Sequence, residues 1–186
     1  MARIPTPPNL PGIVSLMATR PETAKPMNEL AEVLLRGPFP AENSLSRGER
    51  ELIAAVVSTR NRCNFCASSH AAFSAMQIDG GKDVVEAARR DPKTAPISEK
   101  MKALIAIAEE VQKGGDQVKD ATVDIARKQG ATDIEIHDTV LIAAAFCMYN
   151  RYVDGLAAFT PTDPAAYDMV AQMIVSQGYT NTPLLK

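Results

Sequence analysis

Apolar residues recur at helical spacing along almost the whole chain, in segments separated by glycine and proline. A period near 3.6 residues is typical of amphipathic helices. Alternation of apolar and polar residues, the pattern of a half-buried strand, is not evident, and the aromatic residues that favour strands make up only 5%. We therefore expect an all-α chain of about eight helices. Helical spacing is found in nine segments, of which the first is very short: 13–17, 22–35, 46–60, 63–77, 82–90, 98–113, 117–129, 136–159 and 164–177.

Several of these segments have recognisable ends. Ser46 with Glu49, and Thr132 with Glu135, have the form of capping boxes, in which the two side chains satisfy free N–H groups at a helix start. Ser98 is a plausible single N-cap. We expect a short break after residue 60 to fold the 46–60 helix back against the next one.

The length of 186 residues fits a single multi-helix domain spanning 1–186. Four prolines within 1–11 predict an extended N-terminal arm, of a kind that often packs on a neighbouring subunit. The sequence L-I-A-A at 52–55 returns at 141–144, and Asn61-Arg62 returns at Asn150-Arg151, each 89 residues later. This predicts a weak helix-pair repeat, although short matches between alanine-rich helices also arise by chance.

The charge and hydropathy of the chain restrict the classes of partner that we expect. Lys and Arg number 20 against 22 acidic residues, so the net charge is -2 and gives no reason to expect nucleic acid or an anionic membrane. No apolar run approaches the ~20 residues of a membrane span, and the first residues lack the apolar core of a signal peptide. We expect a cytoplasmic protein that acts on a small molecule or another protein. The apolar 136–159 segment and the proline-rich arm also predict a homo-oligomer.

Cys63, Cys66 and His70 are spaced to project from one face of a helix, with Glu51 on the helix before it. Three cysteines are an odd number for a disulfide framework, so a catalytic or metal-binding pair is favoured. A reactive thiolate needs a helix N-terminus, a cation or a base. The helix start at Cys63 offers the first, Arg60 and Arg62 the second, and His70 with Glu51 the third.

Other interpretations compete for these residues. A closed zinc site needs four ligands, and beyond Cys63, Cys66 and His70 the chain offers only His137 or a carboxylate. A redox sensor would form the disulfide without turnover. A thioredoxin-type site is disfavoured because that motif follows a strand. Cys147 lies alone in an apolar run and is best interpreted as a packing residue.

The run from Glu51 through C-N-F-C to His70 resembles the E-x(11)-C-x-x-C-x-x-x-H signature of the alkylhydroperoxidase D-like, carboxymuconolactone decarboxylase-like family. The segment E-R-E-L-I-A-A-V-V-S before the cysteines and N-R-Y-V-D-G-L at 150–156 resemble its peroxidase-related branch more narrowly. The resemblance implies an all-helical fold, trimers or hexamers, and antioxidant reduction of alkyl hydroperoxides without a cofactor. The decarboxylase members lack the cysteine pair, which disfavours lactone decarboxylation here.

The resemblance also implies roles for the residues. The cysteine matching Cys66 attacks the peroxide, the one matching Cys63 resolves it as a disulfide, and Glu51 and His70 relay protons with water. The helix-dipole argument instead favours Cys63 as the more acidic thiol, so the two arguments disagree. Many relatives carry a relay histidine where this chain has Phe65. The thiol or protein that re-reduces the disulfide is not indicated.

Overall fold

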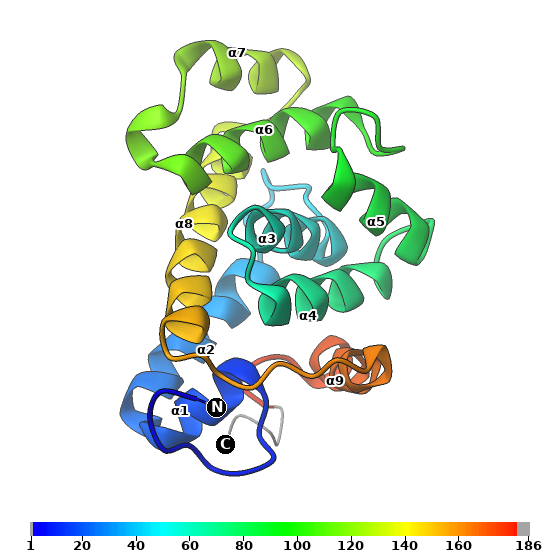
Figure 1. The fold of residues 1–186 in the computed structure, drawn as a ribbon. Helices are drawn as coiled ribbons and strands as arrows, with labels where there is room; N and C mark the ends of the chain where they lie inside the picture. The colour runs from blue at the N-terminus through cyan, green and yellow to red at the C-terminus, as the bar shows by residue number, and fades with distance from the viewer. Residues whose placement is uncertain (1, 182–186) are drawn as a thin grey trace.

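The computed structural model describes residues 2–181, and this part of the chain is entirely helical (Figure 1). No helix within it is both long and apolar enough to cross a membrane. The prediction of an all-α fold is confirmed, with nine α-helices and one 3-10 turn in the described residues. These are α1 (Gly12–Thr19), α2 (Pro21–Leu35), α3 (Arg47–Arg60), α4 (Asn64–Ala75), α5 (Gly81–Arg90), α6 (Glu99–Lys113), η1 (Gly115–Gln117), α7 (Asp120–Lys128), α8 (Asp133–Gly155) and α9 (Pro164–Gln177).

An antiparallel pair, α3 and α4, forms the centre of the molecule (Figure 1). Helices α6 and α8 pack against α3, while α5 and α9 pack against α4. Leu52, Ile53 and Val56 of α3 are fully buried in the main apolar core. Because α3 is covered on nearly every side, a polar residue on it needs a partner inside the protein.

The three predicted helix caps are confirmed, whereas the helix predicted from 117 begins at Asp120. Ser46 and Thr132 each form the full capping box, with Glu49 and Glu135 respectively, and the Ser98 hydroxyl accepts the N–H of Met101. The expected break between α3 and α4 is a tight turn in which Arg62 adopts a positive φ of 62°. Cys63 follows as the N-cap of α4, so the sequence-predicted fold-back brings the cysteine helix beside α3.

The N-terminal arm lies against its own chain, at the end of α8. The Arg3 N–H donates to the Leu156 carbonyl at 2.9 Å, the Arg3 guanidinium donates to the Gly155 carbonyl at 2.6 Å, and the Gly12 N–H donates to the Phe159 carbonyl at 2.7 Å. Helix α8 ends at Gly155 instead of 159, because Ala157 adopts a positive φ of 50° that does not continue the helix. The helix end predicted at 159 is therefore wrong by four residues.

The two asparagines of the possible repeat are in contact. The Asn61 amide donates to Asn150 Oδ1 at 2.8 Å, and the Asn150 amide donates to the Ser58 hydroxyl at 3.0 Å. This network ties the end of α3 to α8. Arg151 and Asp154 are both exposed, and Arg151 bonds to the Cys147 carbonyl at 2.9 Å.

Candidate functional site

Glu51 and His70 face each other between the two central helices. His70 Nδ1 lies 2.6 Å from Glu51 Oε2, and the Glu51 residue is only 2% exposed. An ionised Glu51 accepts the Nδ1 proton, which leaves the lone pair of the imidazole on Nε2. His70 also lines a cavity, so this arrangement gives the cavity a base held in position by a buried carboxylate.

Tyr179 forms a hydrogen bond with the other carboxylate oxygen of Glu51. Its hydroxyl donates to Glu51 Oε1 at 2.6 Å, from a position just beyond the end of α9. Burial and the neighbouring Glu51 raise the pKa of Tyr179 well above its usual value, so the hydroxyl remains a neutral donor. Sequence reasoning missed this residue, because a tyrosine after a helix-terminating glycine carries no chemical signal of its own.

The chain reaches Tyr179 through a fixed turn. Gly178 adopts a φ of 86°, and a Cβ there would lie 2.5 Å from Glu32 Oε2. The same carboxylate oxygen accepts the N–H of Tyr179 at 2.6 Å. Only glycine fits this left-handed, crowded position, and the turn directs the tyrosine side chain inward.

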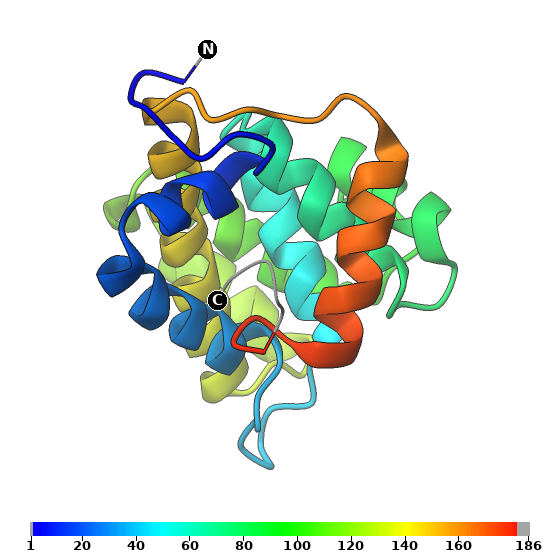
Figure 2. The same ribbon diagram turned by 90° about the horizontal axis from the view of Figure 1, so that it is seen from below.

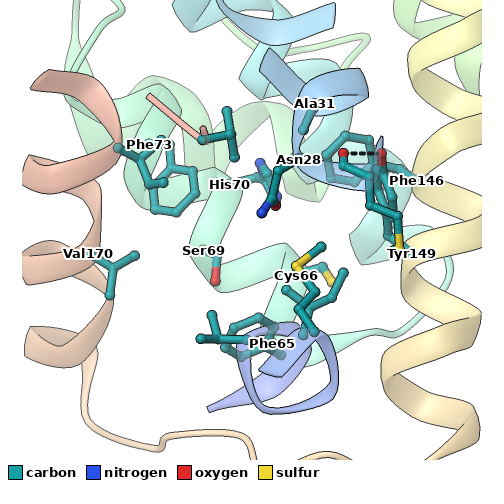
Figure 3. A pocket seen from close by; sticks show the side chains of 16 residues that line it. Asn28, Ala31, Phe65, Cys66, Ser69, His70, Phe73, Phe146, Tyr149 and Val170 are labelled. Carbon is teal, nitrogen blue, oxygen red and sulfur yellow. Dashed lines mark hydrogen bonds between the residues drawn. The ribbon is translucent and has the colours of Figure 1, made fainter. Parts of the chain in front are cut away.

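Cys66 opens onto an apolar cavity beneath α4. Seen from below, α1 and α2 lie on one side of this region and α9 on the other (Figure 2). The cavity has a volume of about 80 Å³, and Cys66 and His70, one helical turn apart, both line it (Figure 3). Its other walls are Ile13, Val14, Met17, Met27, Asn28, Ala31, Phe65, Ser69, Phe73, Phe146, Tyr149, Val170, Ile174 and Tyr179.

Cys63 lies behind Cys66 and does not line the cavity. It is fully buried in a second apolar cluster with Leu16, Val153 and Tyr167. Its hydrogen bond with the Cys66 side chain, together with burial, raises the pKa of the Cys63 thiol. Both cysteines are reduced in this structure. Although Cys63 begins α4, as expected, its surroundings therefore favour the protonated thiol and oppose the helix-dipole prediction.

Cys66 occupies the first turn of α4, where N–H groups point toward the start of the helix. That turn contains no acidic residue. The helix start therefore presents a partial positive charge on this side of Cys66. The expected help from arginine is not found, because Arg60 bonds to Glu109 at 2.7 Å and to the Arg89 carbonyl at 2.8 Å, while Arg62 is exposed.

Phe65 forms a wall of the cavity. Gly12 of α1 lies so close that a Cβ on it would be 2.3 Å from the Phe65 ring. Gly12 also has a φ of 50°. A glycine is thus required both by the backbone at the start of α1 and by the bulk of the ring.

The remaining histidine and cysteine lie elsewhere. The side chain of His137 is 63% exposed and contacts Asp138 at 3.0 Å near the start of α8. Cys147 is half-buried on α8, where its Sγ accepts the Asn61 amide at 3.5 Å. Neither lines the cavity, and no group of three or more His, Cys, Asp or Glu side chains within 2–181 is arranged to hold a metal ion.

Solved structures share this fold at low sequence identity. An uncharacterized peroxidase-related protein from Silicibacter sp. TM1040 superposes with a TM-score of 0.74 at 23% identity, over 85% of this chain and 78% of that one. A protein of the same description from Ralstonia eutropha JMP134, given as an alkylhydroperoxidase AhpD core, has a TM-score of 0.77 at 20% identity, over 92% and 96%. A protein of unknown function from Agrobacterium tumefaciens has a TM-score of 0.68 at 20% identity, over 88% and 100%.

These likenesses identify the fold as the AhpD-like helical fold. No curated protein matches the chain. The sequence profile of the carboxymuconolactone decarboxylase family matches residues 21–91 and 83–161, which together cover most of the chain. The chain therefore belongs to the carboxymuconolactone decarboxylase family.

Proposed function

We propose that the protein is a thiol-dependent peroxidase that reduces organic hydroperoxides at Cys66. The observation that carries the proposal is the unequal placement of the two thiols. Cys66 shares an apolar cavity with His70, whereas Cys63 lies fully buried behind it with a raised pKa. A peroxidatic cysteine must meet the substrate, and a resolving cysteine needs only to reach the oxidised sulfur.

The first chemical step is oxidation of Cys66. His70 Nε2 takes the thiol proton, and the thiolate attacks the terminal oxygen of R–O–OH. The S–O bond forms as the O–O bond breaks, and the electron pair leaves on the alkoxide. The imidazolium of His70 returns the proton and releases the alcohol ROH. Glu51 stabilises that imidazolium, and Tyr179 holds Glu51.

The second step makes the disulfide. The Cys63 sulfur attacks the sulfur of the Cys66 sulfenic acid, the S–O bond breaks, and the thiol proton leaves with hydroxide as water. An external dithiol then reduces the disulfide and returns both thiols. Cys63 at the N-cap and Cys66 in the first turn of α4 lie three residues apart on one helix face, which supports a short path for this step.

The test is thiol mapping by mass spectrometry before and after one equivalent of cumene hydroperoxide. We expect a Cys63–Cys66 disulfide within seconds, and continued peroxide consumption when dithiothreitol is supplied. Cys66→Ser should abolish both results. Cys147→Ser is the matched control, since the third cysteine lies outside the cavity, and it should behave as wild type.

Three outcomes would contradict the proposal. Survival of both thiols would show that this hydroperoxide is not a substrate. A single oxidation that does not turn over with dithiothreitol would indicate a redox sensor. Stoichiometric zinc in protein purified without chelators would indicate a metal-binding module instead.

A further inference from the structure

Asn28 is a buried polar side chain of the cavity without a protein partner in the described part of the chain. It lies within α2, its residue is only 5% exposed, and it lines the same cavity as Cys66 and His70. Figure 3 shows its amide directed into the cavity. Within residues 2–181 the side chain makes no hydrogen bond to protein, although buried amides are nearly always bonded.

The two tyrosine hydroxyls of the cavity already have partners. The Tyr179 hydroxyl bonds to Glu51, and the Tyr149 hydroxyl bonds to the Met27 carbonyl at 3.1 Å. The Ser69 hydroxyl, like the Asn28 amide, makes no hydrogen bond within residues 2–181, but it lies on α4, the same helix as Cys66 and His70. The Asn28 carboxamide comes from α2, so the wall opposite α4 presents a donor and an acceptor to whatever enters.

The amide matches the polar end of a hydroperoxide. The –O–OH group has one hydrogen to donate and two oxygens that accept, and a carboxamide has both N–H donors and an acceptor oxygen. During attack by a thiolate, negative charge develops on the oxygen that leaves. A fixed N–H donor at that oxygen favours the transition state in an apolar, water-poor site.

We propose that Asn28 binds the hydroperoxide group and donates an N–H to the departing alkoxide oxygen while Cys66 attacks the terminal oxygen. The proposal deepens the peroxidase function and rests on it. The electron pair of the thiolate forms the S–O bond, the O–O pair moves to the alkoxide that Asn28 stabilises, and His70 supplies the proton that completes the alcohol. Asn28 itself is neither oxidised nor protonated.

The test compares the rate of Cys63–Cys66 disulfide formation in the full-length protein and its variants. Asn28→Leu keeps the branching of the side chain but has no polar atoms. Asn28→Ala removes the side chain beyond Cβ. A loss of rate that arises only because leucine fills the cavity would not appear in the alanine variant. Glu29→Ala is the matched control, because Glu29 is the next residue on α2 and its side chain is 55% exposed. Hydrogen peroxide and cumene hydroperoxide are the two probes.

We expect both Asn28 variants to lower the second-order rate constant by about tenfold or more with either peroxide. The rate at which iodoacetamide alkylates Cys66, measured in the Cys63→Ser background, should change less than about twofold, because Asn28 acts on the peroxide and not on the thiol. Glu29→Ala should match wild type in both assays.

The result separates this inference from the proposed function. If the wild-type protein is not oxidised by either peroxide, the peroxidase function itself fails. If the wild type reacts and both Asn28 variants react equally fast, only the role of Asn28 is refuted. A loss confined to cumene hydroperoxide, or an equal loss of alkylation rate, would also overturn it, since the amide would then act on the organic group or on the sulfur.

Discussion

Tyr179 and Glu51 are separated by 128 residues in the chain and joined by a hydrogen bond of 2.6 Å at the centre of the site. The bond satisfies one carboxylate oxygen while His70 satisfies the other. Hydrogen bonds to a buried carboxylate are among the stronger ones in proteins. The tyrosine thereby fixes the carboxylate that orients His70, the base of the proposed mechanism.

Tyr179→Phe should therefore affect both stability and thiol reactivity. Loss of the donor leaves a buried carboxylate oxygen unpaired, which costs about 1–3 kcal/mol of unfolding free energy in urea titrations. We also expect the rate of Cys66 oxidation to fall several-fold. Tyr167→Phe is the control, because Tyr167 is similarly buried but donates to the Pro161 carbonyl outside the cavity. Equal oxidation rates in the two variants would refute the role assigned to Tyr179.

Glu51→Gln tests the carboxylate directly. The amide keeps the shape of the side chain but cannot stabilise a positive imidazolium, so proton transfer from Cys66 should slow by about 10²-fold. The measurement is the oxidation rate by cumene hydroperoxide near pH 7, together with circular dichroism to verify the fold. A rate near that of wild type would mean that His70 works without its acidic partner.

Cys63→Ser should separate the two chemical steps. Without the resolving thiol, Cys66 is expected to remain as a sulfenic acid that dimedone traps, and to proceed to sulfinic acid with excess peroxide. Intact-mass and peptide analysis would detect both species. Rapid formation of a mixed disulfide with Cys147 would argue against this outcome, because Cys147 lies outside the cavity on α8.

The raised pKa of Cys63 predicts a loss of stability at alkaline pH. In the unfolded chain the thiol titrates near ~8.5, whereas in the fold it keeps its proton to higher pH. The contribution is complete below the unfolded pKa and declines as pH rises above it, by up to about 1.4 kcal/mol per pH unit. Urea titrations between pH 7 and 10 should show a steeper decline for wild type than for Cys63→Ser. Parallel curves would contradict the assignment.

Gly12→Ala should displace the ring of Phe65, since the added Cβ overlaps it and the positive φ disfavours alanine. We expect a loss of about 1–3 kcal/mol. In a double-mutant cycle, Phe65→Ala should remove part of this penalty, because the overlap no longer occurs. Strictly additive free energies would indicate that the backbone conformation alone accounts for the cost.

The sequence was sufficient for those parts of the site that depend on local rules. Capping residues and the helical period place Glu51 on α3 and set Cys66 and His70 one turn apart on α4. Arg60 was expected to lie near the thiols, but it pairs with Glu109, which is 49 residues away in the sequence. Neighbours in sequence share a helix face, but only tertiary packing decides which charges meet.

Tyr179 and Asn28 were beyond prediction for the same reason. Each comes from an element that reaches the cavity only when the whole bundle has assembled, and neither has a spacing relation to the cysteines. The N-terminal arm was expected to be extended, and residues 2–11 form no helix but contain bends and a turn; the attachment of the arm to the end of α8 depends on carbonyls more than 140 residues away. Proline content predicts conformation but does not predict where a segment docks.

The position of Tyr179 near the end of the described chain has a consequence for biosynthesis. By the time α8 has been translated, both cysteines, the histidine and the glutamate are present and their helices can pack. The hydroxyl that completes the hydrogen bonds of Glu51 arrives only with the last turn after α9. A nascent chain therefore carries its dithiol before Tyr179 is present, and the thiols and Glu51 reach their final environment only after α9 has been translated.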